Sequence, residues 1–375
     1  MTTHLALVGA GHAHLWLLRR ARRLMHGGLT PVLIAPKLFR YSGMASGVLS
    51  GALEPNEAQI DVAALACAAG IAHFSQTVAG IDLAARRLTL DDGAILPFDL
   101  ISLNIGSVVK DDFGLIRCPD VWPVKPLAGL DGLRRRLELD VLQSGRSPKL
   151  VIAGSGPTAF EIAGALAGLC ERLGVVADIQ LIGPDPGALW APPGAAAALT
   201  ASLKARGLKA RQGQIVGRET GLCRLASGET LACDHLVLAT GLRAPDLISQ
   251  LGLPTDDTGR LRTAPTLQSV TKAQVFAAGD CAVIEQTPRP SAGVFGVRAA
   301  PILLHNLIAT ARGRALKPYR PQARWLAIMD LGASKALALR GPTWIFSTLA
   351  LTLKRSLDRR FIRSSRSRVR SKPVA

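Results

Sequence analysis

The apolar positions at the start of this 375-residue chain fall into short runs that predict two buried strands on either side of a helix. Residues 5–8 (LALV) and 31–35 (PVLIA) are continuous apolar runs of strand length, whereas residues 12–25 carry apolar positions at helical spacing. A strand, a helix and a second strand in this order predict a βαβ unit, which forms a parallel sheet covered by helices. Residues 71–105 add short strand-like runs, and Asp92-Gly93 among them predicts a hairpin turn.

The same pattern returns in the middle of the chain. Residues 149–153 (KLVIA) and 177–182 (ADIQLI) predict two more buried strands, and residues 157–173, rich in alanine and leucine, predict the helix between them. Later, residues 275–280 (VFAAGD) predict a strand and residues 291–312 a long helix. The sequence therefore predicts an α/β fold that contains two βαβ units, enough for two domains of the same kind.

A glycine-rich turn joins the first predicted strand to the first helix, with the sequence Gly-Ala-Gly-His-Ala-His at residues 9–14. A strand before such a turn and a helix after it are the context of a dinucleotide-binding loop. Gly9 permits the tight turn, Gly11 lets the backbone approach a pyrophosphate, and the N–H groups of the helix N-terminus favour phosphates. His14 stands where a third Gly or Ala is usual. It predicts either looser packing of helix on strand or a side chain used near the ligand.

A second turn of this kind opens the second unit, with GSGPTAFEIAG at residues 154–164. Gly154 and Gly156 repeat the turn and close-approach roles, and Ala159 is small enough for close helix packing. Glu161 lies near the start of the predicted helix and is expected to face the loop. The alternative is a purely structural role, because the helix dipole stabilises an acidic side chain near a helix N-terminus.

Both units lack the acidic residue that usually follows the second strand and holds a ribose hydroxyl pair. Pro36 and Lys37 stand there in the first unit, and Gly183 in the second, with Asp185 two residues further on. The choice between NADH and NADPH is therefore open.

A Gly-Asp pair, Gly279-Asp280, ends the predicted strand before the long helix. Asp280 could accept hydrogen bonds from a ribityl or ribose hydroxyl, although Gly-Asp turns are common. The Ala-Thr-Gly sequence at 239–241 ends another apolar run. Two dinucleotide loops, this sequence and a late Gly-Asp in this order form a specific combination.

The chain resembles the flavoproteins with two dinucleotide-binding domains, the pyridine nucleotide-disulfide oxidoreductase superfamily. The resemblance covers about residues 3–318, and GPTAFEIAGAL at 156–166 is similar to the second loop of type II NADH dehydrogenases. More closely, the chain looks like the FAD/NAD oxidoreductases found alone or fused ahead of selenide, water dikinase. The segments that carry this resemblance are VGAGHAHL (8–15), YSGMASG (41–47), LISLNIGS (100–107), AGVFGVRAAPILLHNL (292–307), PYRPQ (318–322) and LKRSLDRRF (353–361).

The resemblance implies two Rossmann-like dinucleotide-binding domains, one inserted in the other. Residues 1–118 and 266–318 would form the FAD domain and residues 119–265 the NAD(P) domain. Residues 319–375 would form a C-terminal α/β appendage with a basic amphipathic helix and a disordered tail.

The resemblance also implies FAD and NAD(P)H as cofactors and places residues beside them. Glu161 would lie near the nicotinamide, Asp280 at the middle of FAD, and the helix that begins near Gly293 would point its N-terminus at the flavin pyrimidine edge. The residues expected to bind the cofactors are Gly9, Ala10, Gly11, His12, Ala13, His14, Pro36, Lys37, Ser42, Val78, Asn104, Gly106, Ser107, Gly154, Gly156, Pro157, Thr158, Gly241, Gly279, Asp280, Gly293 and Val294.

The chain carries a formal net charge of +18, which calls for an anionic partner. Residues 354–375 hold nine of the basic side chains and one acid, so the charge is densest there. Phe346, Leu349, Ala350, Leu353, Leu357 and Phe361 recur at helical spacing, whereas Arg355, Arg359 and Arg363 project elsewhere. Such a helix can lie on an anionic membrane surface, or it can pack on the protein body.

The cysteines bear on the electron acceptor. The six thiols, at 67, 118, 170, 223, 233 and 281, form no CxxC or CxxxxC pair, so a disulfide beside the flavin is not expected. Cys281 adjoins the Gly-Asp pair and is expected to be a buried structural residue. The resemblance to type II NADH dehydrogenases implies a quinone-like acceptor, and a sulfide:quinone-type or selenium-related flavin oxidoreductase is the alternative.

No secretory signal is apparent, so the protein is expected on the cytoplasmic face of the membrane with reduced thiols. A non-enzymatic alternative is a flavin-binding module whose basic tail docks nucleic acid or a partner. The tail lacks interleaved aromatic residues beyond Phe361, and no nucleic-acid-binding fold is apparent, so nucleic acid is not expected. Deleting residues 341–375 is expected to release the protein from membranes while flavin binding survives.

Overall fold

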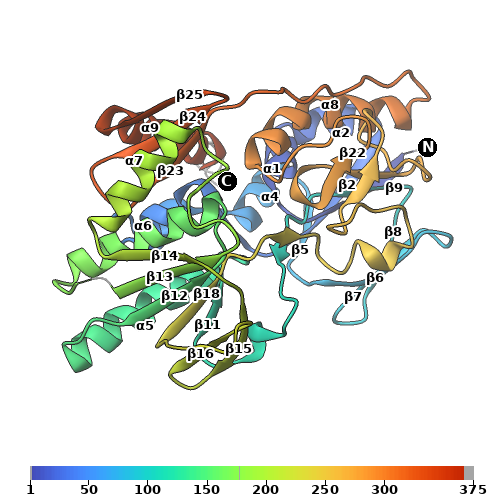
Figure 1. Ribbon diagram of the computed structural model, residues 1–375. Helices are drawn as coiled ribbons and strands as arrows, with labels where there is room; N and C mark the ends of the chain where they lie inside the picture. Colours follow the sequence, from blue (N-terminus) through green and yellow to red (C-terminus); the bar gives the residue numbers. More distant parts are fainter. Residues whose placement is uncertain (1, 177, 367–375) are drawn as a thin grey trace, which may run out of the picture.

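The computed structural model describes residues 2–176 and 178–366 and confirms the predicted α/β class (Figure 1). Two five-stranded parallel sheets form its centre. The first has the order β21-β9-β1-β2-β5, and the second the order β11-β18-β12-β13-β14. Apolar runs such as Leu5–Val8 and Leu150–Ala153 are buried on both faces, as strands in helix-covered parallel sheets require.

The first sheet contains the first βαβ unit. Its strands are β1 (Thr3–Val8), β2 (Leu29–Ile34), β5 (Ala72–Phe74), β9 (Leu100–Leu103) and β21 (Val275–Ala277). The helices that accompany it are α1 (His12–Leu18), α2 (Ala21–His26), α3 (Ala45–Leu49), α4 (Val62–Ala69) and α8 (Gly293–Ala311). The single helix predicted over 12–25 is thus interrupted at Arg19 and Arg20.

Small antiparallel pairs surround the first sheet. They are β3 (Leu38–Arg40) with β4 (Gln59–Asp61), and β6 (Val78–Asp82) with β7 (Arg87–Leu90), which also pairs with β8 (Ile95–Pro97). In addition, β20 (Leu261–Thr263) and β22 (Ala282–Ile284) form a parallel pair. The Asp92-Gly93 turn joins β7 to β8, and Gly93 has a φ of +85°, a conformation that glycine adopts without strain.

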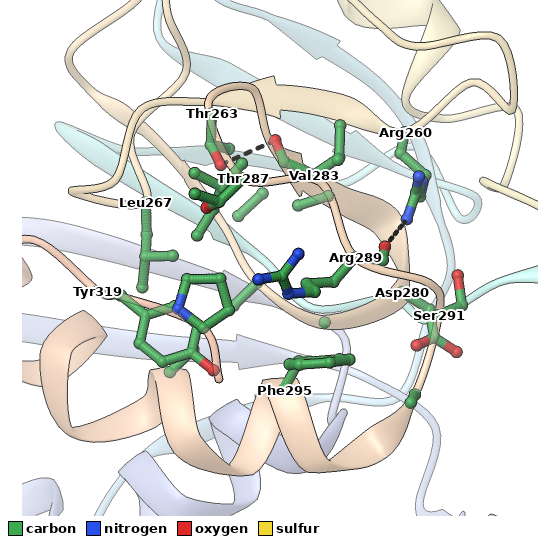
Figure 2. Close-up of a pocket in the computed structure, with 18 of the residues that line it drawn as sticks. Arg260, Thr263, Leu267, Asp280, Val283, Thr287, Arg289, Ser291, Phe295 and Tyr319 are labelled. Carbon is green, nitrogen blue, oxygen red and sulfur yellow. Dashed lines mark hydrogen bonds between the residues drawn. The ribbon is translucent and has the colours of Figure 1, made fainter. Parts of the chain in front are cut away.

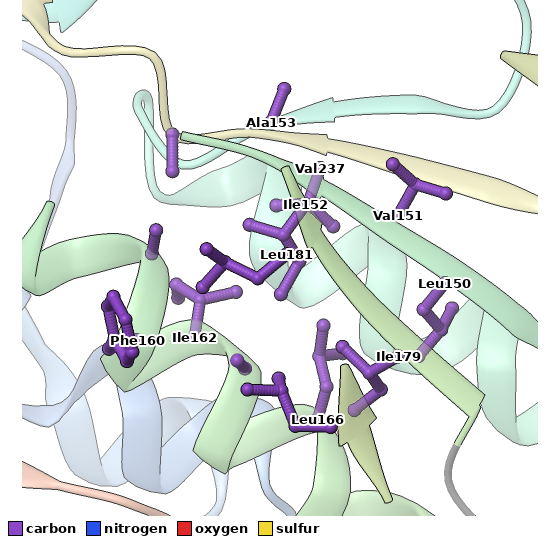
Figure 3. Close-up of a cluster of buried hydrophobic side chains, with 14 of the residues drawn as sticks. Leu150, Val151, Ile152, Ala153, Phe160, Ile162, Leu166, Ile179, Leu181 and Val237 are labelled. Atoms are coloured by element: carbon purple, nitrogen blue, oxygen red, sulfur yellow. The ribbon is translucent and has the colours of Figure 1, made fainter. Parts of the chain in front are cut away.

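The second sheet contains the second unit. Its strands are β11 (Val121–Pro123), β12 (Lys149–Ala153), β13 (Asp178–Gly183), β14 (Leu208–Gln212) and β18 (His235–Leu238), with helices α5 (Ala128–Ser144), α6 (Pro157–Arg172) and α7 (Pro193–Lys204). Figure 3 shows Phe160, Ile162 and Leu166 of α6 facing Ile152, Ile179 and Leu181 of the sheet in one apolar core. A hairpin sheet of β15 (Ile215–Glu219), β16 (Leu222–Leu225) and β17 (Thr230–Ala232) extends from it, and β10 (Val108–Val109) pairs with β19 (Leu242–Arg243) between the two parts.

The C-terminal region folds as a three-stranded antiparallel sheet followed by a helix. Its elements are β23 (Ala327–Asp330), β24 (Ala336–Arg340), β25 (Thr343–Ser347) and α9 (Thr348–Arg366). It meets α6 where that helix carries glycines: a Cβ on Gly168 would lie 2.2 Å from the Gly332 carbonyl oxygen. The small side chains of α6 therefore let the C-terminal sheet approach its backbone. The part of the predicted disordered tail at residues 367–375 lies outside the described residues.

Within the described part of the chain, α8 is the one helix long and apolar enough, by length and composition, to cross a membrane. Half of its most apolar stretch is buried inside the protein, where Leu303, Leu304 and Leu307 join the core around α1. Packing against α1 accounts for the apolar character of α8.

Candidate functional site

A cavity of about 720 Å³ lies between the two parallel sheets and collects most of the residues predicted to bind cofactors. It is bounded by the first glycine turn, the end of β9, the Gly-Asp pair, the start of α8 and the start of α6. The predicted residues that line it are Gly9, Ala10, Gly11, His12, Pro36, Ser42, Val78, Asn104, Gly106, Ser107, Thr158, Glu161, Gly279, Asp280 and Gly293.

The first glycine turn has a structural demand that the sequence does not reveal. Gly9 has a φ of +86°, as a tight turn requires, and a Cβ there would lie 2.5 Å from the Asn104 carbonyl oxygen. A Cβ on Gly11 would lie 2.5 Å from Asn104 Oδ1. Position 11 must therefore be glycine so that the Asn104 side chain can lie against the turn, whether or not a ligand also approaches it.

Asn104 ties the start of α1 to two strands. Its Oδ1 accepts hydrogen bonds from the N–H groups of Ala13 (3.0 Å) and His14 (3.2 Å), which have no partner within the helix. Its Nδ2 donates to the Ala278 carbonyl oxygen at 2.5 Å, just beyond β21. Asn104 thus holds the glycine turn and the Gly-Asp segment in one fixed arrangement at the cavity wall.

His14 does not line the cavity, which corrects the expectation that it lies near the ligand. Its ring is fully buried, with Nδ1 2.7 Å from the Gly9 carbonyl oxygen and Nε2 2.9 Å from Ser102 Oγ. Burial lowers the pKa of His14 to about 4, and the contact with Gly9 opposes this only in part, so the ring is neutral near pH 7. The imidazole hydrogen-bonds the Gly9 carbonyl oxygen in the turn after β1 and the Ser102 hydroxyl on β9, so α1 packs closely on the sheet.

His12 is the histidine that faces the cavity. Its ring lies among three aromatic rings, 5.4 Å from Phe39, 5.6 Å from Tyr41 and 5.3 Å from Phe361 between centroids. Burial lowers its pKa to about 4, Asp280 raises it and Lys125 lowers it further. A neutral His12 can accept or donate one hydrogen bond at the cavity, and Phe361 brings the C-terminal helix to the same place.

Asp280 is held by a lysine that lies far away in the sequence. Its Oδ2 accepts hydrogen bonds from Lys125 Nζ at 2.7 Å and from Ser107 Oγ at 3.1 Å, and Lys125 Nζ also lies 2.9 Å from Ser107 Oγ. Burial alone would raise the pKa of Asp280, but Lys125 and Ser107 outweigh it and the pKa is lowered. The carboxylate is therefore charged at the cavity wall and can accept hydrogen bonds from ligand hydroxyls.

Glu161 closes the cavity from the side of the second sheet. Its Oε1 accepts hydrogen bonds from Ser46 Oγ (3.0 Å) and from the Asp330 N–H (3.1 Å). Burial raises the pKa of Glu161, while Lys354 and these two donors lower it in part. Glu161 can therefore hold a proton at the cavity wall at a pH where an exposed glutamate has lost its proton.

Lys354 links Glu161 to the C-terminal helix. It is only 7% exposed, donates to Asp358 Oδ2 at 3.1 Å and to the Gly43 carbonyl oxygen, and its pKa is raised because Glu161, Asp358 and Asp330 outweigh the effect of burial. Tyr41 donates to the other Asp358 oxygen at 3.0 Å. Lys354 and Asp358 thus form an internal ion pair rather than part of the exposed basic tail to which their sequence position assigned them.

Eight predicted residues do not line the cavity. Ala13 and His14 lie in the core of the first sheet, and Lys37 is exposed. Gly154 and Gly156 form the second turn, where Gly154 has a φ of +126° and a Cβ would lie 2.2 Å from the Ala239 carbonyl oxygen. The remaining predicted residues outside the cavity wall are Pro157, Gly241 and Val294.

Several residues of the site carry no sequence signal. Lys125 lies in a proline-rich link, between Pro123 and Pro126, Ser46 lies in a short helix, and Lys354 lies in a run of basic residues. Each acts through a partner more than 100 positions away in the sequence or on another element, so local patterns could not identify them. Ser46 and Lys354 fall in the segments YSGMASG and LKRSLDRRF, which carry the family resemblance, but the resemblance assigned them no role.

Comparison with known proteins gives consistent results. Residues 3–297 match the sequence profile of the family described as pyridine nucleotide-disulphide oxidoreductase. An NADH dehydrogenase-like protein of Mycobacterium tuberculosis is 29% identical over 75% of this chain and 73% of its own length. A demethylphylloquinone reductase of Synechocystis is 23% identical over 94% of this chain and 91% of its own length.

The fold also matches a solved structure. The sulfide:quinone oxidoreductase from Aquifex aeolicus superimposes with a TM-score of 0.79 at 16% identity, over 98% of this chain and 92% of that one. At this identity the likeness concerns the fold.

Proposed function

Because the chain belongs to the pyridine nucleotide-disulphide oxidoreductase family, we propose that it is an NAD(P)H dehydrogenase that passes electrons from FAD to a quinone-like acceptor at a membrane surface. As a member of this family, the protein is an oxidoreductase that uses FAD and a nicotinamide nucleotide. The acceptor and the membrane are the proposal.

The observation that carries the proposal is the single cavity that joins the first glycine turn to Glu161. Its volume, about 720 Å³, lies in the range of about 300–1,000 Å³ that small-molecule and cofactor sites occupy. Its walls suit FAD: α8 begins at Gly293 without a side-chain cap, so free N–H groups face the cavity, and charged Asp280 accepts from hydroxyls. FAD, when bound, supplies the two-electron chemistry between nicotinamide and acceptor.

The residues around the cavity position the reactants and set the local charge. The N-terminus of α8 stabilises negative charge at its end of the cavity. Lys125 keeps Asp280 ionised and in place, and Glu161, whose pKa is raised by burial, can take up a proton at the opposite wall. Hydride transfer itself needs only close and correct placement of the two rings, which the cavity walls would provide when both cofactors are bound.

A quinone-like acceptor is supported by the cysteines. All six are free thiols, and none lines the cavity. Cys281 is fully buried, and burial raises the pKa of its thiol to about 11, so it remains protonated. The site therefore offers no disulfide to receive the electrons, and the demethylphylloquinone reductase similarity favours a quinone.

The proposed activity has a direct test. The purified protein is expected to be yellow, with an absorption band near 450 nm that bleaches when NADH or NADPH is added without oxygen. Adding a water-soluble quinone is expected to restore the band. A protein that holds FAD but is bleached by neither nucleotide contradicts the proposal, and bleaching without recovery contradicts the quinone.

The membrane part of the proposal rests on side chains that α9 leaves exposed. Leu349, Leu353 and Leu357 follow one another at intervals of four residues and form an apolar stripe along the helix, with exposures from 45% to 76%. On the same helix, arginines that include Arg355, Arg359, Arg360 and Arg363 line an adjoining groove. An exposed apolar patch beside basic side chains suits the surface of an anionic membrane.

The exposed apolar side chains of α9 are not the whole set predicted from the sequence. Ala350 is buried, Phe361 is half-buried, and Phe346 belongs to β25 rather than to the helix. The face that packs on the body contains Leu351, Lys354, Asp358 and Ile362 instead. The predicted stripe is thus divided, and its leucines remain on the outside.

We expect replacement of Leu349, Leu353 and Leu357 by glutamine to weaken binding to anionic lipid vesicles by at least about tenfold, because each leucine loses its apolar burial in the interface. Co-sedimentation with vesicles measures this. The control replaces Leu139, Leu142 and Leu189, which are 52%, 82% and 82% exposed on other elements. Equal losses in both variants contradict docking through α9.

Deletion of residues 341–375 would not test membrane binding alone, because it also removes side chains that lie beside the cavity. The expectation that flavin binding survives the deletion does not fit the structure, since α9 contributes Phe361 beside His12 and Lys354 near Glu161. The substitutions leave both contacts in place.

A further inference from the structure

A second, smaller cavity lies on the far side of the Gly-Asp segment from the cofactor cavity (Figure 2). It is bounded by β20, β22, the loop that follows β22, and the first turns of α8, and Tyr319 and Pro321 close it. The two cavities share Gly279, Asp280, Ser291 and Ala292 as a common wall.

The cavity contains a buried hydroxyl that has no partner. Tyr319 is 8% exposed, and its Oη makes no hydrogen bond in the part of the chain that the structure describes. A buried polar atom without a partner costs about 1–3 kcal/mol, so such atoms are rare unless a ligand or water completes them. The Tyr319 hydroxyl lacks a protein acceptor and can donate to an oxygen atom inside the cavity.

Two arginines near this hydroxyl also lack acidic partners. Arg289 donates to the backbone oxygens of Gln322 (3.3 Å) and Pro288 (3.1 Å), and neither Arg289 nor Arg298 forms an ion pair with a described residue. Burial raises the pKa of Tyr319, and the positive charges of Arg298 and Arg289 lower it in part. Arg289 lines the cavity, whereas Arg298 is exposed and lies outside its wall. Figure 2 shows Arg289 extending into the same cavity that Tyr319 and Phe295 border.

The acidic groups around the cavity are already engaged. Asp280 is held by Lys125 and Ser107 on its other side, Asp256 is paired with Arg260 at 2.7 Å, and Glu285 with Arg262 at 3.3 Å. Arg260 in turn donates to the Arg289 carbonyl oxygen at 2.8 Å and holds that loop in place. The cavity wall therefore offers the buried Tyr319 hydroxyl and the Arg289 guanidinium without an acidic partner among the described residues, and together they favour an anion.

The size of the cavity limits the ligand. The interior measures about 50 Å³, and a single water needs about 10–15 Å³, so the space suits about four water-sized atoms. A nicotinamide or quinone ring does not fit, whereas a tetrahedral oxyanion does. Arginine guanidinium groups bind phosphate oxygens through paired hydrogen bonds, and a phenol donates to one more.

We propose that this cavity is a binding site for a small oxyanion of the phosphate type, held by the Tyr319 hydroxyl and Arg289 and assisted by Arg298. The oxyanion is either free or the phosphoryl end of a larger molecule. The site is separate from the hydride-transfer site, and the proposal does not depend on the identity of the electron acceptor.

The test measures phosphate binding by isothermal titration calorimetry on the FAD-bound protein, with sodium chloride of equal ionic strength as the blank. We expect saturable binding, and we expect Tyr319→Phe and Arg289→Gln each to weaken it by about tenfold or more, since each removes hydrogen bonds to a charged group. Arg320→Gln is the matched control, because Arg320 is exposed, next to Tyr319 in sequence, and outside the cavity wall. It is expected to bind as the wild type does.

Thermal unfolding gives a second reading that separates binding from folding. Tyr319→Phe removes a hydroxyl that has no partner, so without phosphate its unfolding midpoint is expected to equal or exceed that of the wild type. Phosphate is expected to raise the midpoint of the wild type and of Arg320→Gln, and to raise that of Tyr319→Phe much less. A parallel titration with glycerol phosphate identifies the source, because tighter binding of the ester indicates the end of a larger ligand.

Absence of saturable binding to the wild type overturns the proposal. So does equal affinity in the wild type, Tyr319→Phe and Arg289→Gln, or a loss in Arg320→Gln as large as theirs. Because binding is measured without turnover, these outcomes are independent of whether nucleotide bleaches the flavin.

Discussion

Replacing Asp280 with asparagine is expected to weaken FAD binding by about 10- to 100-fold. Asp280 is the charged acceptor at the middle of the cavity wall, and hydrogen bonds to a charged group contribute about 1.5–3 kcal/mol. The substitution also leaves the Lys125 ammonium, now 2.7 Å from the carboxylate and 23% exposed, without its counterion. The dissociation constant of FAD, followed by the recovery of free-flavin fluorescence, measures the effect.

The chain offers a matched control for this experiment. Lys110 and Asp112 form a similar ion pair at 3.0 Å, but both side chains are 55% exposed and lie away from the cavity wall. Asp112→Asn is therefore expected to leave FAD binding unchanged, since exposed ion pairs contribute little. FAD retained equally by Asp280→Asn and Asp112→Asn contradicts the assignment of Asp280 to the cofactor.

The parts of the site that are local in sequence could be predicted, and Asp280 is one of them. The glycine turns require positive φ at Gly9 and Gly154, and the Gly279-Asp280 pair follows a strand in a fixed place, so short motifs identify them. Lys125 could not be found in this way, because it reaches Asp280 across 155 positions. His14 was misplaced for a related reason: its partner Ser102 is 88 positions away.

The C-terminal helix shows a second limit of sequence patterns. Periodicity identified α9 as amphipathic, but the apolar stripe does not show which side packs on the body. The structure turns Leu349, Leu353 and Leu357 outward and buries Lys354 with Asp358. Lys354 can be buried because Glu161, Asp330 and Asp358 surround it, and these come from three separate elements. The internal ion pair thus depends on the assembled fold.

Through Glu161, this arrangement couples the proposed membrane helix α9 to the cavity in the body of the protein. The cavity side of Glu161 contacts Ser46, and its far side is within electrostatic reach of Lys354 of α9. Tyr41 reaches the same ion pair and stacks on Phe361, with ring centroids 4.5 Å apart. A change in the seating of α9 therefore alters both the aromatic group beside His12 and the charge beside Glu161.

Replacing Lys354 with methionine is expected to lower the stability of the fold by about 3–5 kcal/mol at pH 8, as the loss of one partner of a buried pair does. In the wild type the raised pKa of Lys354 means that its contribution is fully present below the pKa of an unfolded lysine and is lost only as pH rises through the folded value. It is therefore constant between pH 5 and pH 8.

In the variant, the pH dependence of stability comes from the carboxyl groups instead of the lysine. Burial already raises the pKa of Glu161 and Asp358, and loss of the cation raises both further. A carboxyl whose folded pKa exceeds its unfolded value gives stability that is present below the unfolded pKa and is lost as pH rises through the folded pKa. Lys354→Met is therefore expected to be nearer to the wild type at pH 5 than at pH 8, as thermal unfolding midpoints at the two pH values measure.

Two further variants separate charge from packing. Lys209→Met removes a lysine that is 73% exposed in a 3.5 Å pair with Asp178, and it is expected to change the midpoint little at either pH. Glu161→Gln in the Lys354→Met background keeps an oxygen for Ser46 and the Asp330 N–H while removing one buried charge, so it is expected to recover part of the loss at pH 8. A deficit for Lys354→Met that is equal at pH 5 and pH 8, or that Glu161→Gln deepens, shows that the methionine acts through packing. That result contradicts the electrostatic link between α9 and the cavity.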